Sequence, residues 1–124
     1  MATKAEVRNK ALRKIRVIES GQTPETDAAT DVDATYDELH AYFSKENAAY
    51  WDLDEDIPDE AVPFVVVILA SMIADEFAVE EMRSQRLHIR AFGLEGAPDN
   101  GALGQLIELA SNQYVSMPIE AEYF

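Results

Sequence analysis

The acidic side chains near the middle of the chain are the residues best suited to binding a metal ion. Asp52, Asp54 and Asp56 alternate like the first, third and fifth ligands of a helix–loop–helix calcium site. In such a site the sixth residue is a glycine that allows a sharp turn, and the twelfth is a glutamate that binds through both oxygens. Here those positions are Ile57 and Pro63. We therefore expect a solvated acidic loop that binds no metal ion.

A glycine-rich segment has the spacing of a phosphate-binding loop. Gly96 and Gly101 stand where the two glycines of that loop would stand. The loop must continue with a lysine and a serine or threonine, and here Ala102 and Leu103 follow. Without the lysine the phosphates would lack a charge partner, so we predict a turn.

Neither histidine belongs to a catalytic or metal-binding motif. Asp37 and His40 share a helix face, but a two-metal bundle needs a second such pair and two further carboxylates. We expect His40 to be a surface or interface residue, and His88 has no partner close in sequence. The chain has no cysteine, which excludes disulfides and thiolate zinc sites, and it has no Gly-x-Ser-x-Gly motif. We therefore expect neither enzyme activity nor a cofactor.

The net charge of −14 is unevenly distributed along the 124 residues. Residues 1–18 hold six of the ten basic side chains and one acid, whereas residues 19–82 hold eighteen acids and one lysine. A body this acidic repels nucleic acid, so we do not expect tight DNA binding as the main function. The basic first segment leaves two interpretations open. It lies against acidic protein surface, or it binds nucleic acid in a small regulatory protein.

The elements that position these residues are predicted to be helices. Thr3 and Glu6 form a capping box that begins a first helix, and Gly21 is expected to end it. A second helix is expected to begin with Thr23 as its cap and Pro24 in its first turn. It should run towards residue 49, with one apolar stripe. The stripe comprises Val32, Tyr36, Leu39 and Phe43, and Tyr50 is a further candidate.

A third helix is expected to begin between residues 59 and 63. Residues 64–74 are apolar on all sides, which is typical of a helix in the middle of a bundle or at a subunit interface. A buried strand is the alternative, but the length favours a helix. The run is shorter than the about 20 residues that a membrane helix requires. A fourth helix over 79–92, a turn over 93–101 and a short fifth helix over 103–110 complete an all-α bundle of four to five helices.

The end of the chain has a different pattern. Apolar residues alternate with polar ones from Val115 to Tyr123, which is the period of an extended strand. Pro118 disfavours a central strand, and no other strand is predicted to pair with this one. We therefore divide the chain into a helical bundle domain, 1–111, and an extended C-terminal tail, 112–124, that binds a partner chain or, alternatively, is disordered or packs on its own domain. The candidate partner-binding residues are Val115, Met117, Pro118, Ile119, Tyr123 and Phe124.

Several short motifs, in this order and spacing, give the chain a recognisable pattern. They are Val7, Arg8, Ala11, Leu12, Arg13, Lys14 and Ile15 in the first helix; Gly21, Gln22, Thr23 and Pro24 before the second; Ile57, Pro58, Asp59, Glu60 and Ala61 before the third; Ala70, Ser71, Ala74, Asp75, Glu76 and Phe77 at its end; and Pro118, Tyr123 and Phe124 at the close of the chain. Over nearly its whole length the chain resembles the head-to-tail adaptor proteins of tailed bacteriophages and gene-transfer agents. These proteins are also described as head-completion or packaged-DNA stabilisation proteins.

This resemblance implies a structural virion protein at the junction of capsid and tail, assembled in the host cytoplasm. Such a protein forms a homo-oligomeric ring, usually a dodecamer, beneath the portal protein. It connects the portal to tail or nozzle proteins and helps to retain packaged DNA. The C-terminal segment is expected to reach the portal or a neighbouring subunit. Acidic side chains facing the channel would let DNA slide without specific binding, because like charges repel. The candidates in this chain are Asp52, Asp54, Glu55 and Asp56, or the acidic face of the second helix.

Overall fold

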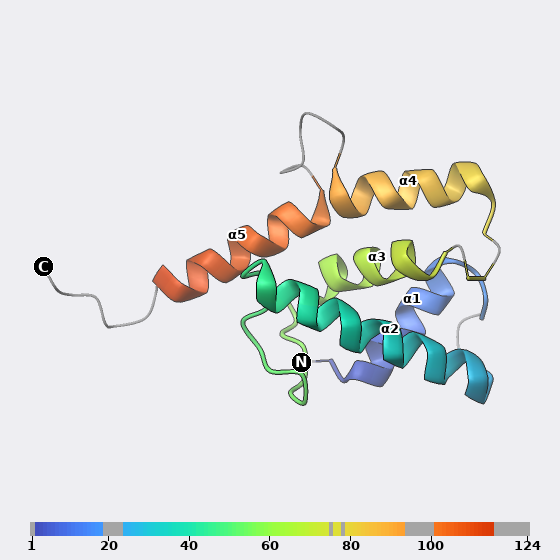
Figure 1. Ribbon diagram of the computed structural model, residues 1–124, viewed down its shortest axis with the longest axis horizontal. Coiled ribbons are helices and arrows are strands. Elements are labelled where there is room, and N and C mark those ends of the chain that lie inside the picture. The colour runs from blue at the N-terminus through green and yellow to red at the C-terminus, as the bar shows by residue number, and fades with distance from the viewer. Residues whose placement is uncertain (1, 19–23, 75, 78, 94–100, 116–124) are drawn as a thin grey trace, which may run out of the picture.

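The computed structural model describes residues 2–18, 24–74, 76–77, 79–93 and 101–115, and for 113–115 it describes the backbone alone. These residues form five helices, so the predicted all-α bundle is confirmed (Figure 1). The helices are α1 (Lys4–Lys14), α2 (Thr26–Lys45), α3 (Val62–Ile73), α4 (Glu81–Phe92) and α5 (Ala102–Val115).

The third helix is the centre of the bundle, as its uniformly apolar sequence predicted. It contacts each of the other four helices. Its side chains at Val65, Ile68, Leu69, Ala70 and Ile73 are fully buried. A helix surrounded by other helices has no face that must be polar, which explains why this segment lacks an amphipathic pattern. Pro63 lies in its first turn, where a missing N–H group leaves no hydrogen bond unmade.

Helix α1 begins as predicted but ends earlier. The Thr3 side chain accepts a hydrogen bond from the Glu6 backbone N–H, and the Glu6 carboxylate accepts one from the Thr3 N–H. The helix ends at Lys14 and not near Gly21, because Arg16 adopts a left-handed backbone with a φ of 64°. The N–H of Val17 then bonds to the Leu12 carbonyl, and the N–H of Arg16 bonds to the Arg13 carbonyl. This pair of bonds is a Schellman motif, which normally has glycine at the left-handed position.

Helix α2 begins two residues later than predicted. Glu25 is its N-cap, without a side-chain hydrogen bond, and Pro24 precedes the helix instead of occupying its first turn. The proposed cap, Thr23, lies outside the described residues. The helix stops at Lys45 and not near residue 49, because Asn47 takes a φ of 59° in a second Schellman motif. The predicted apolar stripe is confirmed, since Val32, Tyr36, Leu39 and Phe43 are all buried.

The start of the chain is tied to the segment between α2 and α3. Ala2 and Ile57 exchange two backbone hydrogen bonds, of 3.0 and 2.8 Å, in an isolated antiparallel bridge. Both side chains are buried in the core. The bridge fixes the end of the acidic loop against the N-terminus of α1.

The last two helices meet at a tight corner. The α4 helix ends at Phe92, and its C-cap Gly93 has a φ of 81°. A Cβ atom at Gly101 would lie 2.3 Å from the Gly93 backbone nitrogen, so two backbone segments touch where α5 begins. Leu106 and Ala110 of α5 are buried, and Leu103 and Ile107 pack against the core half-buried, as expected for an amphipathic fifth helix.

The fifth helix is longer than predicted, which corrects the start of the tail. It continues to Val115, so residues 112–115 are helical where an extended segment was predicted. The alternation of apolar and polar residues was the wrong signal here, because Leu106, Ala110 and Tyr114 continue the four-residue spacing of a helix. Among the described residues, no helix combines the length and the apolar character needed to cross a membrane.

Candidate partner-binding surfaces

Of the six predicted tail residues, the structure describes one, Val115, and only its backbone. Val115 is the last residue of α5, and its backbone is helical. Met117, Pro118, Ile119, Tyr123 and Phe124 lie outside the described residues. Their assignment as partner-binding residues therefore stays a prediction.

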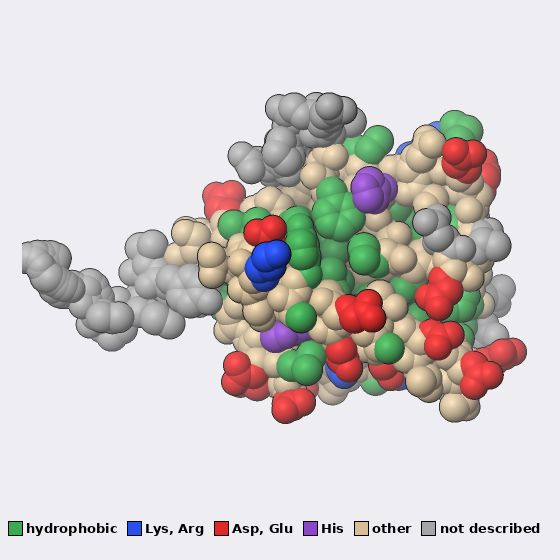
Figure 2. Space-filling view, viewed as in Figure 1, with side chains coloured by type: hydrophobic (Ala, Val, Ile, Leu, Met, Phe, Trp, Pro, Cys, Tyr) green, Lys and Arg blue, Asp and Glu red, His purple; other side chains and the backbone are tan. Residues whose placement is uncertain are grey.

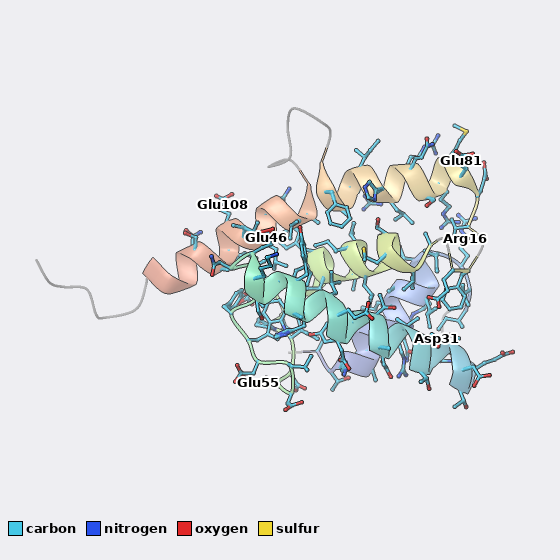
Figure 3. The ribbon with its side chains drawn as sticks, in the orientation of Figure 1. Arg16, Asp31, Glu46, Glu55, Glu81 and Glu108 are labelled. Carbon is cyan, nitrogen blue, oxygen red and sulfur yellow. The ribbon has the colours of Figure 1, made fainter. Side chains whose placement is uncertain are left out.

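The predicted channel-facing acids are exposed on the loop between α2 and α3. Asp52, Asp54, Glu55 and Asp56 are all exposed, and Glu55 is labelled at the outer edge of this loop in Figure 3. The Glu55 carboxylate accepts a hydrogen bond of 2.9 Å from the Asp52 backbone N–H, and the Glu55 N–H donates to the Asp52 carbonyl at 3.0 Å. The loop therefore carries a fixed turn that presents several carboxylates to solvent.

An aromatic cluster holds this loop on the bundle. The Trp51 indole Nε1 donates to the Tyr36 hydroxyl at 3.1 Å, and both side chains are buried. The Trp51 ring also meets Phe43 and Tyr50 edge to face. Tyr50 donates to the Glu60 carboxylate at 3.0 Å; burial and then this carboxylate raise the pKa of Tyr50. Such packing positions the acidic loop rigidly.

His40 belongs to the same cluster and is not the surface residue that its sequence context suggested. Its side chain is only 8% exposed, and its Nε2 lies 2.9 Å from the Trp51 carbonyl oxygen. Because a carbonyl only accepts, Nε2 carries the proton. His40 therefore helps to anchor the loop. Among the described residues, no group of three or more His, Cys, Asp or Glu side chains is arranged to hold a metal ion.

A basic cleft lies between the end of α1 and the outer face of α4. It has a volume of about 530 Å³. Its cations are Lys14, Arg16, Arg83, Arg86 and Arg90, and Glu80, Met82 and Leu87 complete its lining. Half of the basic side chains of the chain thus meet in one hollow of an acidic protein. In Figure 3, Arg16 lies at the end of the molecule where α1 ends and α4 begins.

One hydrogen bond joins the two sides of the basic cleft. The Arg83 guanidinium donates from Nη2 to the Lys14 backbone carbonyl at 2.6 Å. This carbonyl belongs to the last turn of α1, where carbonyls lack partners within the helix and favour cations. Arg83 therefore has a structural role. Arg16, Arg86 and Arg90 are exposed, and among the described residues none of them has such a bond to a backbone carbonyl.

The positive charge of the basic cleft is not neutralised within the described residues. The ion pairs among the described residues are Lys4–Asp37, at 2.5 Å, and Arg8–Asp33, at 3.1 Å. Both join α1 to α2 and lie outside the cleft. The Lys14 pKa is lowered by burial and then by the charges of Arg90 and Arg83. The cations of the cleft therefore repel one another, which favours the binding of a negatively charged group there.

The cleft was not predicted from the sequence, because only the first segment, residues 1–18, stands out as basic. The signal was present: Arg83, Arg86 and Arg90 are spaced three and four residues apart and therefore share one face of α4. Their proximity to Lys14 was not readable, since 69 residues separate Lys14 from Arg83.

An apolar hollow of about 320 Å³ lies where α2, α3 and α4 meet. It is lined by Leu39, Tyr42, Met72 and Phe92, together with Glu38. Met72 is 50% exposed and Tyr42 is 40% exposed. Figure 2 shows apolar side chains gathered between these helices, with acidic side chains over α2 beside them. The patch is suited to contact with another protein surface.

Comparison of the chain with protein-family models, with curated proteins and with solved structures finds no match.

Proposed function

We propose that this protein is a structural, non-catalytic adaptor subunit at the capsid–tail junction of a tailed bacteriophage or gene-transfer agent. In this role it would form a homo-oligomeric ring beneath the portal protein, connect the portal to the tail, and help to retain packaged DNA. The sequence motifs of the helices and of the chain's end suggest this class. The surface of the bundle provides independent support.

The observation that carries the proposal is the separation of charge on a compact bundle. Five cations meet in the basic cleft, whereas most of the exposed acids among the described residues lie on or next to α2 and on the loop before α3. Subunits of a ring need two different surfaces that fit each other, and opposite charges are one way to specify such a fit. A catalytic protein would instead be expected to bring perturbed acids and bases together in one pocket.

The acidic loop supports the part of the proposal that concerns DNA. Asp52, Asp54, Glu55 and Asp56 are exposed on a turn fixed by the Trp51 cluster. Carboxylates held at the wall of a channel would repel phosphates across a layer of water and prevent adhesion. We assign these four residues to the channel wall.

The tail is proposed to bind the portal or a neighbouring subunit. The length of α5 changes how this should be tested. Removing everything after Asn112 would cut the last turn of α5, whereas a chain ending at Val115 keeps the helix whole. The matched control replaces residues 116–124 with the same number of glycines and serines, which preserves length and removes the alternating apolar side chains.

The decisive experiment is electron microscopy and native mass measurement of the full chain mixed with the portal protein of the same particle. A closed ring docked on the portal would support the proposal. The chain ending at Val115 and the glycine–serine control should remain folded and fail to dock. Absence of any complex between the full chain and the portal would overturn the adaptor function. Normal docking of both tail variants would overturn the role of the tail.

A nucleic-acid-binding regulator is the second candidate, and the basic cleft is the observation that favours it. The cleft joins the basic end of α1 to the arginines of α4, which provides the second basic element that such a protein needs. The net charge of −14 opposes it. A salt-dependent affinity for duplex DNA would support this alternative, and absence of binding at low salt would exclude it.

A further inference from the structure

The basic cleft contains more positive charge than the fold uses. Arg83 is bonded to the end of α1, and Lys4 and Arg8 are paired with acids of α2 outside the cleft. Arg16, Arg86 and Arg90 point three exposed guanidinium groups into or around the same hollow, with Glu80 as the acid in its lining. Guanidinium groups bind carboxylates through two parallel hydrogen bonds, so the cleft is suited to an anionic surface.

The helix α2 carries a matching acidic stripe, formed by Asp27, Asp31 and Glu38. These residues are four and seven positions apart, so they lie on one face of the helix. That face borders the apolar hollow at Glu38 and is distinct from the face that pairs with α1 through Asp33 and Asp37. All three carboxylates are exposed, and no ion pair involving them occurs among the described residues. Asp31 is labelled on α2 in Figure 3.

We propose that the basic cleft of one copy binds the acidic stripe of a second copy. The contact joins two different surfaces, so it repeats from copy to copy and generates a closed ring or an open filament. This contact between copies would build the ring of the proposed adaptor, and its biological role rests on that proposed function.

A protein partner fits this cleft better than a nucleic acid does. Duplex DNA is a long rod of uniform negative charge, and it would pass close to Glu80 in the cleft and to the neighbouring Glu81. The acidic stripe has three carboxylates on one helix, so it is much shorter than a duplex and brings less negative charge past Glu80. At physiological salt the Debye length is about 8 Å, so the repulsion between two negatively charged copies is screened while direct contacts in the cleft are not.

The test is a charge-swap complementation with the full chain. The cleft variant is Arg86→Glu/Arg90→Glu, and the stripe variant is Asp31→Lys/Glu38→Lys. Each variant has one surface of the wrong sign, so each alone should lose self-association at physiological salt. Mixed together, the acidic cleft of the first meets the basic stripe of the second, and the two unmodified surfaces also fit. The mixture should therefore associate again, as seen by sedimentation and native mass measurement.

Two matched controls separate the contact from net charge. Lys10→Glu/Lys45→Glu makes the same charge change as the cleft variant at exposed cations outside the cleft, and Glu46→Lys/Glu108→Lys makes the same charge change as the stripe variant at exposed acids outside the stripe. Both should self-associate within about twofold of the wild type, whereas the cleft and stripe variants should weaken association by more than about tenfold. Circular dichroism and thermal unfolding confirm that every variant is folded.

Three results would overturn the inference. They are a wild-type chain that stays monomeric at physiological salt, a mixture of the two variants that does not associate, or binding of duplex DNA that depends on Arg86 and Arg90 in place of self-association. Because these measurements use no portal protein, they can succeed while docking to the portal fails. The reverse is also possible, so the two proposals are tested independently.

Discussion

Replacing Arg16 with glycine should stabilise the protein. Arg16 holds a φ of 64° at the left-handed position that ends α1, and its side chain is exposed. A residue with a Cβ atom is strained there by roughly 1 kcal/mol, and glycine is not. Glycine also loses more chain entropy on folding, but at the left-handed position that closes a helix the preference for glycine is the larger effect. We expect Arg16→Gly to raise the free energy of unfolding by about 0.5–1 kcal/mol, which corresponds to roughly 2–6 °C in the midpoint of thermal unfolding.

The substitution also removes a charge from the basic cleft, so a control must separate the two effects. Arg16→Ala removes the same charge and keeps the strain. Chemical unfolding of both variants therefore measures the backbone contribution as the difference between glycine and alanine. Asn47→Gly, at the second left-handed position, should give a smaller gain because asparagine tolerates this conformation. The strain argument would be refuted if Arg16→Gly were no more stable than Arg16→Ala.

Three further substitutions test the core, the corner between α4 and α5, and the basic cleft. Tyr36→Phe leaves the buried Trp51 N–H without its acceptor and should cost about 1–3 kcal/mol in urea unfolding, with a changed tryptophan emission spectrum. Gly101→Ala places a Cβ atom 2.3 Å from the Gly93 nitrogen, and the backbone shift it forces should cost about 1–3 kcal/mol by the same assay; wild-type stability would contradict the tight corner. Lys14→Gln should be more stable than the wild type at neutral pH. The pKa of Lys14 in the folded protein lies below the value of 10.5 in the unfolded chain. Between these two pKa values the unfolded state binds more protons than the folded state, so the wild type becomes more stable as the pH rises through this window. The advantage of Lys14→Gln should shrink as pH rises through this window, and a constant or growing advantage would contradict the assignment.

The helices were readable from the sequence, because their patterns depend on neighbouring residues. The apolar stripe of α2 reflects burial on one side, and the apolar sequence of α3 reflects its contacts with all four other helices. The capping box at Thr3 is likewise a local motif. The end of α1 was not readable, since glycine is the usual signal for a Schellman motif and this chain places Arg16 at that position.

The surfaces were less readable than the helices, because they depend on which distant segments meet. The acidic loop was found, since its residues are consecutive. Its anchoring by Trp51 and His40 required the fold, because His40 lies eleven residues before its hydrogen-bond partner on another element. The basic cleft combines residues at the end of α1 with residues of α4, and the sequence gives their charges but not their proximity in space.

The central position of α3 has a consequence for how the protein unfolds. Each of the other helices buries part of its apolar face against α3, so α3 cannot leave the bundle without exposing all four of them. The cooperative unit is therefore the whole set of five helices, and the amide hydrogens of α3 exchange with solvent only when the entire domain opens.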